Sequence, residues 1–173
     1  HHGVGIFITD QRLDYSIGST TRFTQNLADI GISTNTQVLR KMIVPASVGV
    51  ARHLNMAPEN LVLGIETLRI ADGLPLCVIS HFLPTHPYGE ILEDYVEGSL
   101  HEILMRQCST LKRKESLVIA ILPQGDDAKL LGIAQNRPVL RVKSLNVQHR
   151  DGVPVEYAIT RFRADRIQLR ISP

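Results

Sequence analysis

One segment of this chain occurs twice, and the duplication limits the possible folds more than any other feature. Residues 51–75 and 128–154 share an A-x-x-L-x-[MI]-A opening, a V-L-x-[IV] run, a [TS]-L step and a D-G-x-P turn. The copies lie 77 residues apart at the opening and 79 apart at the turn, so two residues are inserted before the second turn. Each copy is typical of a short helix, a strand, a tight Asp-Gly turn and a returning strand.

A doubled helix-plus-hairpin unit predicts an α+β domain in which both copies enclose one shared interior. Two copies are too few for a solenoid, and the 173 residues, 43% of them hydrophobic, suffice for one core.

The formal net charge of +2 gives no sign of a polyanion-binding surface. Cys77 and Cys108 form no C-x-x-C pattern and are expected as reduced thiols. No apolar run approaches the roughly 18 residues of a membrane span, and no signal peptide is evident, so we expect a cytoplasmic protein without a membrane partner.

Turn and capping signals place the other elements along the chain. In chain order we expect a strand at 3–9, a linker at 10–20, a helix at 24–30, a strand at 36–44, helical turns at 88–95 and a strand at 112–122. The basic start of the last strand is expected in solvent. Ser47 is a candidate cap for the first repeat helix, and Ser99-Leu-His-Glu102 matches the S-x-x-E capping box of a helix at 98–107.

The start of the chain suggests a fragment. The strand at 3–9 has nothing before it to pair with, which indicates that the chain comes from a longer protein. His1 and His2 are either native or the remnant of an expression tag.

Strand periodicity predicts a polar site at the ends of both hairpins. Alternate side chains of a strand share a face. In the first copy that face carries Leu61, Leu63, Ile65, Thr67 and Arg69, and in the second copy it carries Leu140, Val142, Ser144 and Asn146. Both faces change from apolar to polar along the strand. If the copies are related by pseudo-symmetry, their polar ends meet in one region of the fold.

Arg69 is the positively charged residue of this region, and it requires a negatively charged partner. An arginine keeps its proton, and burial of an unpaired guanidinium is costly, so Arg69 must meet a carboxylate or a bound anion. Ser99, as the expected cap of a helix, stands beside free backbone N–H groups and the positive end of the helix dipole, and His101 could donate as well. These residues predict an anion site. The alternative is that Ser99 only caps its helix and that Arg69 pairs with Glu66 or Glu156.

Glu156 adds an acid to the same region. It follows the second Asp-Gly turn and shares a strand face with Ala158, Thr160 and Phe162. A ligand with an anionic group and a polar or cationic group would suit Arg69 together with Glu156. A direct Arg69–Glu156 salt bridge explains the same residues, and both alternatives stay open at this point.

The motifs of catalysis and metal binding are weak or missing from the sequence. His81 and His86 are five residues apart across a proline-containing turn, which is not the spacing of metal ligands on one helix or strand. Neither a G-x-S-x-G motif, a glycine-rich phosphate loop nor a Cys-His nucleophile arrangement occurs. The sequence therefore predicts no metal, no cofactor and no catalytic residue.

A basic cluster follows the second hairpin. Arg163 and Arg166 flank Asp165, and with Arg161 they are expected to form a solvated edge with local ion pairs. Arg161 shares a strand face with Tyr157 and could instead reach a ligand.

Five segments, taken together in their order, resemble a known family. They are TRFTQNLADIG (21–31), LRIADGLPL (68–76), GSLHEIL (98–104), RPVLRVKSLN (137–146) and DGVPVEYAITRFRADRIQL (151–169). Their order is similar to the UTRA effector domain of the HutC subfamily of GntR transcription regulators, and most of all to the phosphonate-utilisation regulators. GVGIFIT at 3–9 also resembles the last wing strand of a winged-helix DNA-binding domain.

The resemblance implies an α+β domain of the chorismate-lyase type at 21–173, with an antiparallel sheet and flanking helices, after a wing strand at 1–9 and a linker at 10–20. Such a domain forms a homodimer, binds a small anionic effector and acts on DNA through an N-terminal domain that this chain lacks. The family's anion-binding motif falls here on Thr24, Arg69, Ser99 and His101. A glutamate that contacts the rest of the ligand falls on Glu156.

Departures from the family pattern limit the choice of ligand. The amino-sugar-phosphate branch has a second arginine and an acid where this chain has Thr67 and Ile79, which disfavours an amino-sugar phosphate. The phosphonate branch is expected to have a T-R-I-like segment where residues 116–118 are Ser-Leu-Val. Phosphate, phosphonates, sulfate-like anions and organic acids remain.

We therefore expect the effector-sensing and dimerisation domain of a bacterial transcription regulator. One alternative is a chorismate-lyase-like enzyme in which Arg69 holds a substrate carboxylate. Another is a structural dimer module whose charges only pair with one another.

Overall fold

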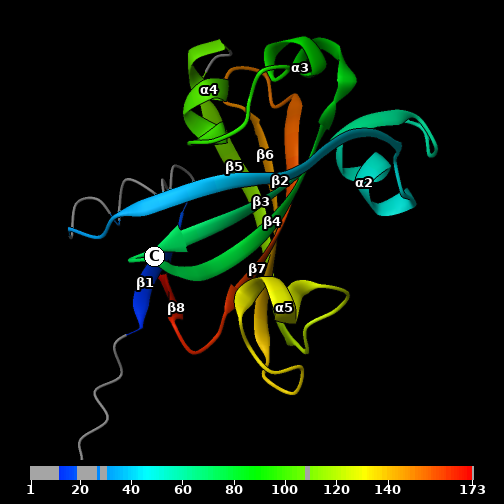
Figure 1. Ribbon diagram of the computed structural model, residues 1–173. Helices are drawn as coiled ribbons and strands as arrows, with labels where there is room; N and C mark the ends of the chain where they lie inside the picture. The colour runs from blue at the N-terminus through cyan, green and yellow to red at the C-terminus, as the bar shows by residue number, and fades with distance from the viewer. Residues whose placement is uncertain (1–11, 19–26, 28–30, 108–109, 173) are drawn as a thin grey trace, which may run out of the picture.

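A six-stranded antiparallel sheet forms the centre of the fold, which confirms the expected α+β class (Figure 1). The computed structural model describes residues 12–18, 27, 31–107 and 110–172. The strands are β1 (Leu13–Ile17), β2 (Thr34–Pro45), β3 (Leu61–Ala71), β4 (Leu74–Pro84), β5 (Leu111–Ile121), β6 (Val139–Gln148), β7 (Pro154–Arg163) and β8 (Ile167–Ile171). The helices are α2 (Val48–His53), α3 (Thr85–Ile91), α4 (Leu100–Gln107) and α5 (Asp127–Leu131).

The large sheet is built from two copies of one unit. The first copy runs β2, α2, β3, β4 and the second runs β5, α5, β6, β7. The strand order β2-β3-β4-β7-β6-β5 places the copies side by side, with β4 against β7 at the centre. Each copy thus begins with a strand, β2 or β5, that the repeated sequence motif does not include. Both of these strands are sheet edges, and each has a bulge against its neighbour.

The Asp-Gly turns join the strands as the sequence predicted. β3 and β4 are connected by Asp72 and Gly73, whose φ angles are 51° and 76°. These left-handed angles suit a two-residue hairpin turn and are best tolerated by Gly, Asn and Asp. In the second hairpin Gln148 N donates to Val153 O at 2.8 Å, which leaves four residues between them in the turn. The two inserted residues of the second copy therefore lengthen its turn.

Helices α2 and α5 pack on one face of the sheet, and each packs on strands of the other copy. Ala51 of α2 belongs to one cluster with Leu145 of β6 and Tyr157 of β7. Leu131 of α5 belongs to a cluster with Val78 of β4. This exchange joins the two copies over a shared interior, as the duplication predicted. Among the described residues, no helix is both long enough and apolar enough to span a bilayer.

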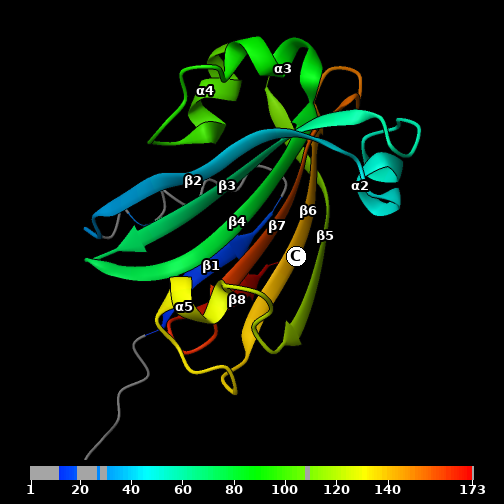
Figure 2. The same ribbon diagram turned by 45° about the vertical axis from the view of Figure 1, so that its right-hand side comes forward.

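The other face of the sheet is covered at its two ends by different elements (Figures 1 and 2). At one end α3 and α4 pack on the sheet through a cluster that includes Tyr88, Leu104 and Ile65. At the other end β1 and β8 cover it through a cluster that includes Tyr15 and Phe162. The space between these two covers holds the candidate site.

The N-terminal segment corrects one prediction. A linker was expected at 10–20, but Leu13–Ile17 form β1, which pairs in parallel with β8. Apolar and polar residues alternate in this segment, so Tyr15 is buried, with 6% of its surface exposed, in the same cluster as Phe162. Therefore β1 is part of the packed domain and does not act as a free connection.

Several other predictions fall partly outside the described residues. The strand expected at 3–9 lies wholly outside them, and of the helix expected at 24–30 only Leu27 is described, as a fully buried residue. Cys77 is a free, buried thiol, and Cys108 is outside the described residues.

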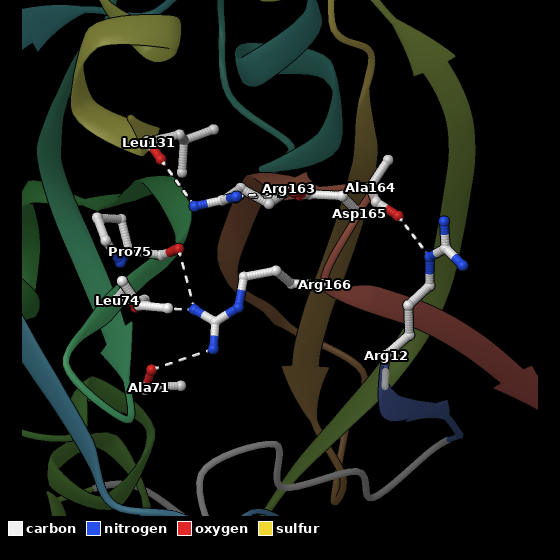
Figure 3. Close-up of polar contacts among 9 residues, drawn as sticks. All are labelled: Arg12, Ala71, Leu74, Pro75, Leu131, Arg163, Ala164, Asp165 and Arg166. Atoms are coloured by element: carbon white, nitrogen blue, oxygen red, sulfur yellow. Dashed lines mark hydrogen bonds and ion pairs between the residues drawn. The ribbon is translucent and has the colours of Figure 1, made fainter. Parts of the chain in front are cut away.

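Residues of the turn between β7 and β8 form hydrogen bonds both with the first hairpin and with the residue before β1 (Figure 3). The guanidinium of Arg166 donates to three carbonyl oxygens of the first hairpin at distances of 3.2, 3.3 and 3.4 Å. Arg12 Nε, just before β1, donates to Ala164 O at 2.9 Å. Arg163 pairs with Asp165 at 2.7 Å, which is one of the local ion pairs that the sequence predicted. Arg166, expected in solvent, is half-buried instead.

Candidate functional site

A cavity of about 130 Å³ lies between the sheet and the start of α4. Its walls come from one face of β3, β4, β6 and β7, from the edge strands β2 and β5, from β1, and from α4 with the loop before it. The structure brings together here the polar ends of both hairpins, namely Thr67 and Arg69 of the first copy and Ser144 and Asn146 of the second. The expected meeting of the two duplicated faces is confirmed.

Arg69 forms one wall of the cavity together with its neighbour on β2. Its Nε lies 3.5 Å from Thr36 Oγ1, and the two residues are partners in the β2–β3 register. The acids that the sequence offered as partners contact other side chains. Glu66 lies 3.7 Å from Arg40, and the carboxylate of Glu156 lies 2.5 Å from His81.

The start of α4 faces Arg69 across the cavity. Ser99 Oγ accepts a hydrogen bond from Glu102 N at 3.2 Å, as the capping box predicted, so the hydroxyl hydrogen of Ser99 remains available to a ligand. Gly98 precedes it with a φ of 86°, a conformation that favours glycine. Helix geometry leaves the first N–H groups of α4 without intrahelical acceptors, and the helix dipole makes this end positive. His101 in the first turn also lines the cavity.

Tyr95 holds this helix start in place. Its hydroxyl donates to Gly98 O at 2.9 Å, and Gly98 N donates to Thr36 O at 3.3 Å. Burial raises the pKa of Tyr95 to about 12, although the charge of Arg69 opposes the shift. The phenol therefore stays protonated and keeps donating over the whole physiological pH range.

The opposite wall is a buried acid with two hydrogen-bond donors. Glu156 is 6% exposed, and its carboxylate accepts from His81 Nδ1 at 2.5 Å and from Asn146 Nδ2 at 2.8 Å. The other ring nitrogen of His81 lies 3.0 Å from Thr67 Oγ1. Burial alone would raise the pKa of Glu156, but the His81 and Asn146 hydrogen bonds and the charges of His81 and His101 hold it below its ordinary value. Glu156 is therefore an ionised group that is fixed in position.

This arrangement gives the cavity two chemically different sides. A guanidinium, a serine hydroxyl and a helix start are suited to an anion such as a phosphate, because all of them donate hydrogen bonds. The side made by Glu156 and Asn146 is suited to a polar group that can donate to a carboxylate. No group of three or more potential metal ligands occurs among the residues that the structure describes.

Arg161 does not belong to the cavity lining. It lies on the opposite face of β7, where it is 8% exposed and pairs with Asp127 of α5 through two bonds of 3.0 and 3.1 Å. A third bond joins its Nη1 to Ser80 Oγ at 2.8 Å. Contact with a ligand in this cavity would require Arg161 to leave all of these partners. Thr24, the remaining expected ligand residue, lies outside the described residues.

His81, Arg113 and Tyr15 were not predicted from the sequence as binding residues of this site. His81 was considered only as a metal ligand, although its alternation with Ile79 on β4 would have placed it in the cavity. Arg113 belongs to the basic start of β5 that was expected in solvent, but it is half-buried and lines the cavity. Tyr15 reaches the cavity from β1, within the segment that was expected to be a linker.

Comparison with known proteins places this chain in a family. The UTRA domain model matches residues 29–168. The chain is 34% identical over 169 residues to the "Probable transcriptional regulator PhnF" of Escherichia coli K12, with 96% of this chain and 69% of that protein covered. The chain therefore belongs to the UTRA family, and curated relatives that it matches are transcription regulators.

Two solved structures agree with this assignment. The crystal structure of a PhnF C-terminal domain superposes with a TM-score of 0.78 at 27% identity and covers 96% of this chain and 99% of that chain. The structure of PhnF from Mycobacterium smegmatis superposes with a TM-score of 0.83 at 19% identity, covering 94% of this chain and 72% of that chain, which supports the fold. Because this chain matches the UTRA family and a transcription regulator at 34% identity, it is a regulatory domain and the enzyme alternative is set aside.

Proposed function

We propose that this domain senses a small anionic ligand of the phosphate or phosphonate type and thereby controls DNA binding by an N-terminal winged-helix domain. The observation that carries the proposal is the meeting of Arg69 with the capped start of α4 in one cavity. Charge-assisted hydrogen bonds of about 1.5–3 kcal/mol each can offset the loss of hydration of an anion that enters between them. Thr24 and His101 complete the proposed anion-binding set.

Glu156 would recognise the part of the ligand that carries no negative charge. Its carboxylate is held by His81 and Asn146, so it is already oriented before a ligand arrives. A ligand hydroxyl or amine that donates to Glu156 would be positioned by the same contact. Preorganisation of this kind favours affinity because little conformational freedom is lost on binding.

The cavity lining disfavours an amino-sugar phosphate. Thr67 is fully buried and is hydrogen-bonded to His81, and Ile79 places an apolar side chain in the wall. Neither residue supplies the additional cation and acid that such a ligand meets in the amino-sugar branch of the family. A small phosphonate, inorganic phosphate or a sulfate-like anion remains the better match.

Dimerisation is a second part of the proposal. The edge strand β5 exposes consecutive apolar side chains, with Leu117 59%, Val118 37% and Ile119 39% exposed. An edge strand with apolar side chains is a ready surface for pairing with another chain. In a homodimer these residues would be covered. Leu117→Lys is expected to shift the mass measured by light scattering from dimer to monomer, and an unchanged mass would exclude β5 as the contact.

Thermal unfolding in the presence of anions tests the ligand. A ligand that binds only the folded state stabilises it by about 2.7 kcal/mol at a concentration of 100 times its Kd. We expect phosphate or methylphosphonate to raise the Tm of the wild-type chain and to leave the Tm of Arg69→Ala unchanged. Arg40→Ala is the matched control, because Arg40 lies on the neighbouring strand in an exposed ion pair with Glu66. Equal shifts in wild type and Arg69→Ala would contradict the proposed site.

The regulatory part needs the full-length protein. Operator DNA affinity is to be measured with and without the anion that binds the isolated chain. Coupling requires the anion to bind one arrangement of the protein better than the other, so the DNA affinity must change. An anion that binds at Arg69 but leaves the DNA affinity unchanged would refute the sensing role while retaining the site.

A further inference from the structure

Arg113 lines the cavity, and two of its hydrogen-bond donors have no partner among the described residues. Its Nη2 donates to the Tyr15 hydroxyl at 2.8 Å, and its guanidinium carbon lies 5.7 Å from the centre of the Tyr15 ring. Its Nε and Nη1 are buried, and neither has a hydrogen-bond partner within the described part of the chain. A buried guanidinium that uses so few of its donors is costly, because an arginine cannot become neutral by losing its proton.

The neighbours of Arg113 place its side chain in the wall of the proposed ligand site. Arg113 is the register partner of Asn146, and Asn146 is in turn the partner of Glu156. All three residues line the cavity that also contains Arg69. The two arginines come from opposite halves of the duplicated sheet, β3 and β5, so an anion in the cavity can meet a guanidinium from each copy.

Tyr15 connects Arg113 to the N-terminal strand. It is buried on β1, and its ring centroid lies 5.2 Å from that of Phe162, a cavity-lining residue of β7. β1 itself is held by its pairing with β8 and by Leu13 N, which donates to Arg166 O at 2.7 Å. A change at the Arg113–Tyr15 contact therefore acts on the first strand of the described domain.

We propose that Arg113 is a second anion-binding residue of this cavity and that its hydrogen bond to Tyr15 couples the ligand to β1. This inference rests on the proposed anion-sensing function and adds a residue and a route to it. The guanidinium is planar and rigid, so an anion that accepts a hydrogen bond from it also fixes the direction of Nη2. The bond to Tyr15 then persists longer, and β1 is held more firmly against β8. By linkage, a firmly held β1 raises the affinity for the anion.

The binding half of the inference is tested by titration calorimetry of the whole chain with inorganic phosphate and methylphosphonate. Loss of a charge-assisted hydrogen bond predicts an affinity lower by about ten-fold to a hundred-fold for Arg113→Met. Arg141→Met is the matched control. Arg141 also has a buried Nε without a partner among the described residues, but it does not line the cavity. The control is expected to bind like the wild type.

A structural role for Arg113 gives a different result. If Arg113 served only to hold Tyr15, Arg113→Met would lower the Tm without anion and leave the affinity unchanged. We expect the opposite, a Tm without anion within a few degrees of the wild type and a large loss of affinity. If Arg113→Met does not fold, Arg113→Lys replaces it, because lysine keeps the charge but lacks the rigid fork, and a reduced affinity is again expected.

The coupling half is tested by hydrogen exchange of the peptide that contains β1. Saturation with the anion should slow exchange in residues 13–17 of the wild type. Tyr15→Phe removes only the hydroxyl, so it should lose the slowing of exchange and, by linkage, bind the anion more weakly than the wild type. Exchange in β1 that does not respond to the anion in the wild type would overturn the coupling.

The outcomes separate this inference from the proposed function. If no anion binds the wild type, both fail. If anions bind and Arg69→Ala abolishes binding while Arg113→Met binds like the wild type, the proposed function stands and this inference is wrong.

Discussion

Replacement of Glu156 by glutamine is the most informative single change in the buried polar network. The carboxylate accepts from His81 at 2.5 Å and from Asn146 at 2.8 Å, and it is 6% exposed. In Glu156→Gln one amide oxygen can keep the Asn146 bond, but the amide NH₂ then faces the donor of His81. The variant therefore loses one charge-assisted hydrogen bond, which contributes about 1.5–3 kcal/mol.

Urea unfolding at neutral pH measures this loss as a decrease in the free energy of unfolding. In thermal unfolding, a loss of about 1.5–3 kcal/mol corresponds to a decrease in Tm of roughly 3–12 °C for a domain of this size. Glu66→Gln is the control on the same sheet, because Glu66 pairs with a largely exposed Arg40 at 3.7 Å. Its loss should stay below about 0.5 kcal/mol, since exposed ion pairs contribute little.

The pH dependence gives a second readout of the same interaction. The pKa of Glu156 in the folded protein is held below its ordinary value of 4.5, so the unfolded chain takes up the proton first as the pH falls. The stabilisation is complete above that ordinary value and disappears as the pH falls through the folded pKa. The gap between the wild type and Glu156→Gln should therefore be widest near neutrality and close in acid. A gap no larger than that of Glu66→Gln, or one that persists unchanged in acid, would refute the reasoning.

Three further variants test other parts of the structure. Asp127→Asn should destabilise the chain by about 3–5 kcal/mol in denaturant unfolding, because it leaves the buried charge of Arg161 without its partner. A loss below about 1 kcal/mol would argue that the ion pair does not stabilise the fold. Gly98→Ala should cost about 1–2 kcal/mol and weaken phosphate binding, since its φ of 86° strains any residue with a Cβ beside the Ser99 cap; unchanged stability and affinity would contradict this. Lys41→Met should cost about 1–2 kcal/mol, because its ammonium donates to carbonyl oxygens after α3 at 2.8 and 3.2 Å, and wild-type stability would show that these bonds contribute nothing.

The parts of the fold that could be predicted from the sequence are those set by local patterns. The duplicated Asp-Gly turns fix where each hairpin reverses, and period-two alternation then decides which side chains share a face. These two rules sufficed to bring Arg69 and Asn146 to one cavity, although they lie in different copies. The cap at Ser99 followed from the capping box alone.

The parts that were missed depend on contacts between distant segments. β1 is five residues long and pairs in parallel with β8 at the other end of the chain, and no local signal records such a pairing. Arg113 donates a hydrogen bond to Tyr15 of β1, and a sequence that predicts a linker at 10–20 gives no reason to expect this contact. The hydrogen bond between Glu156 and His81 likewise depends on the pairing of β4 with β7, which brings the two side chains together.

A crystal structure of the chain grown with methylphosphonate would show whether an anion binds between Arg69 and the start of α4. We expect the phosphonate group in the cavity, with its oxygens at about 3 Å from the Arg69 guanidinium and from the Ser99 hydroxyl. This expectation would be contradicted by a structure in which the anion binds elsewhere and the Arg69 guanidinium is neutralised by a carboxylate of the protein.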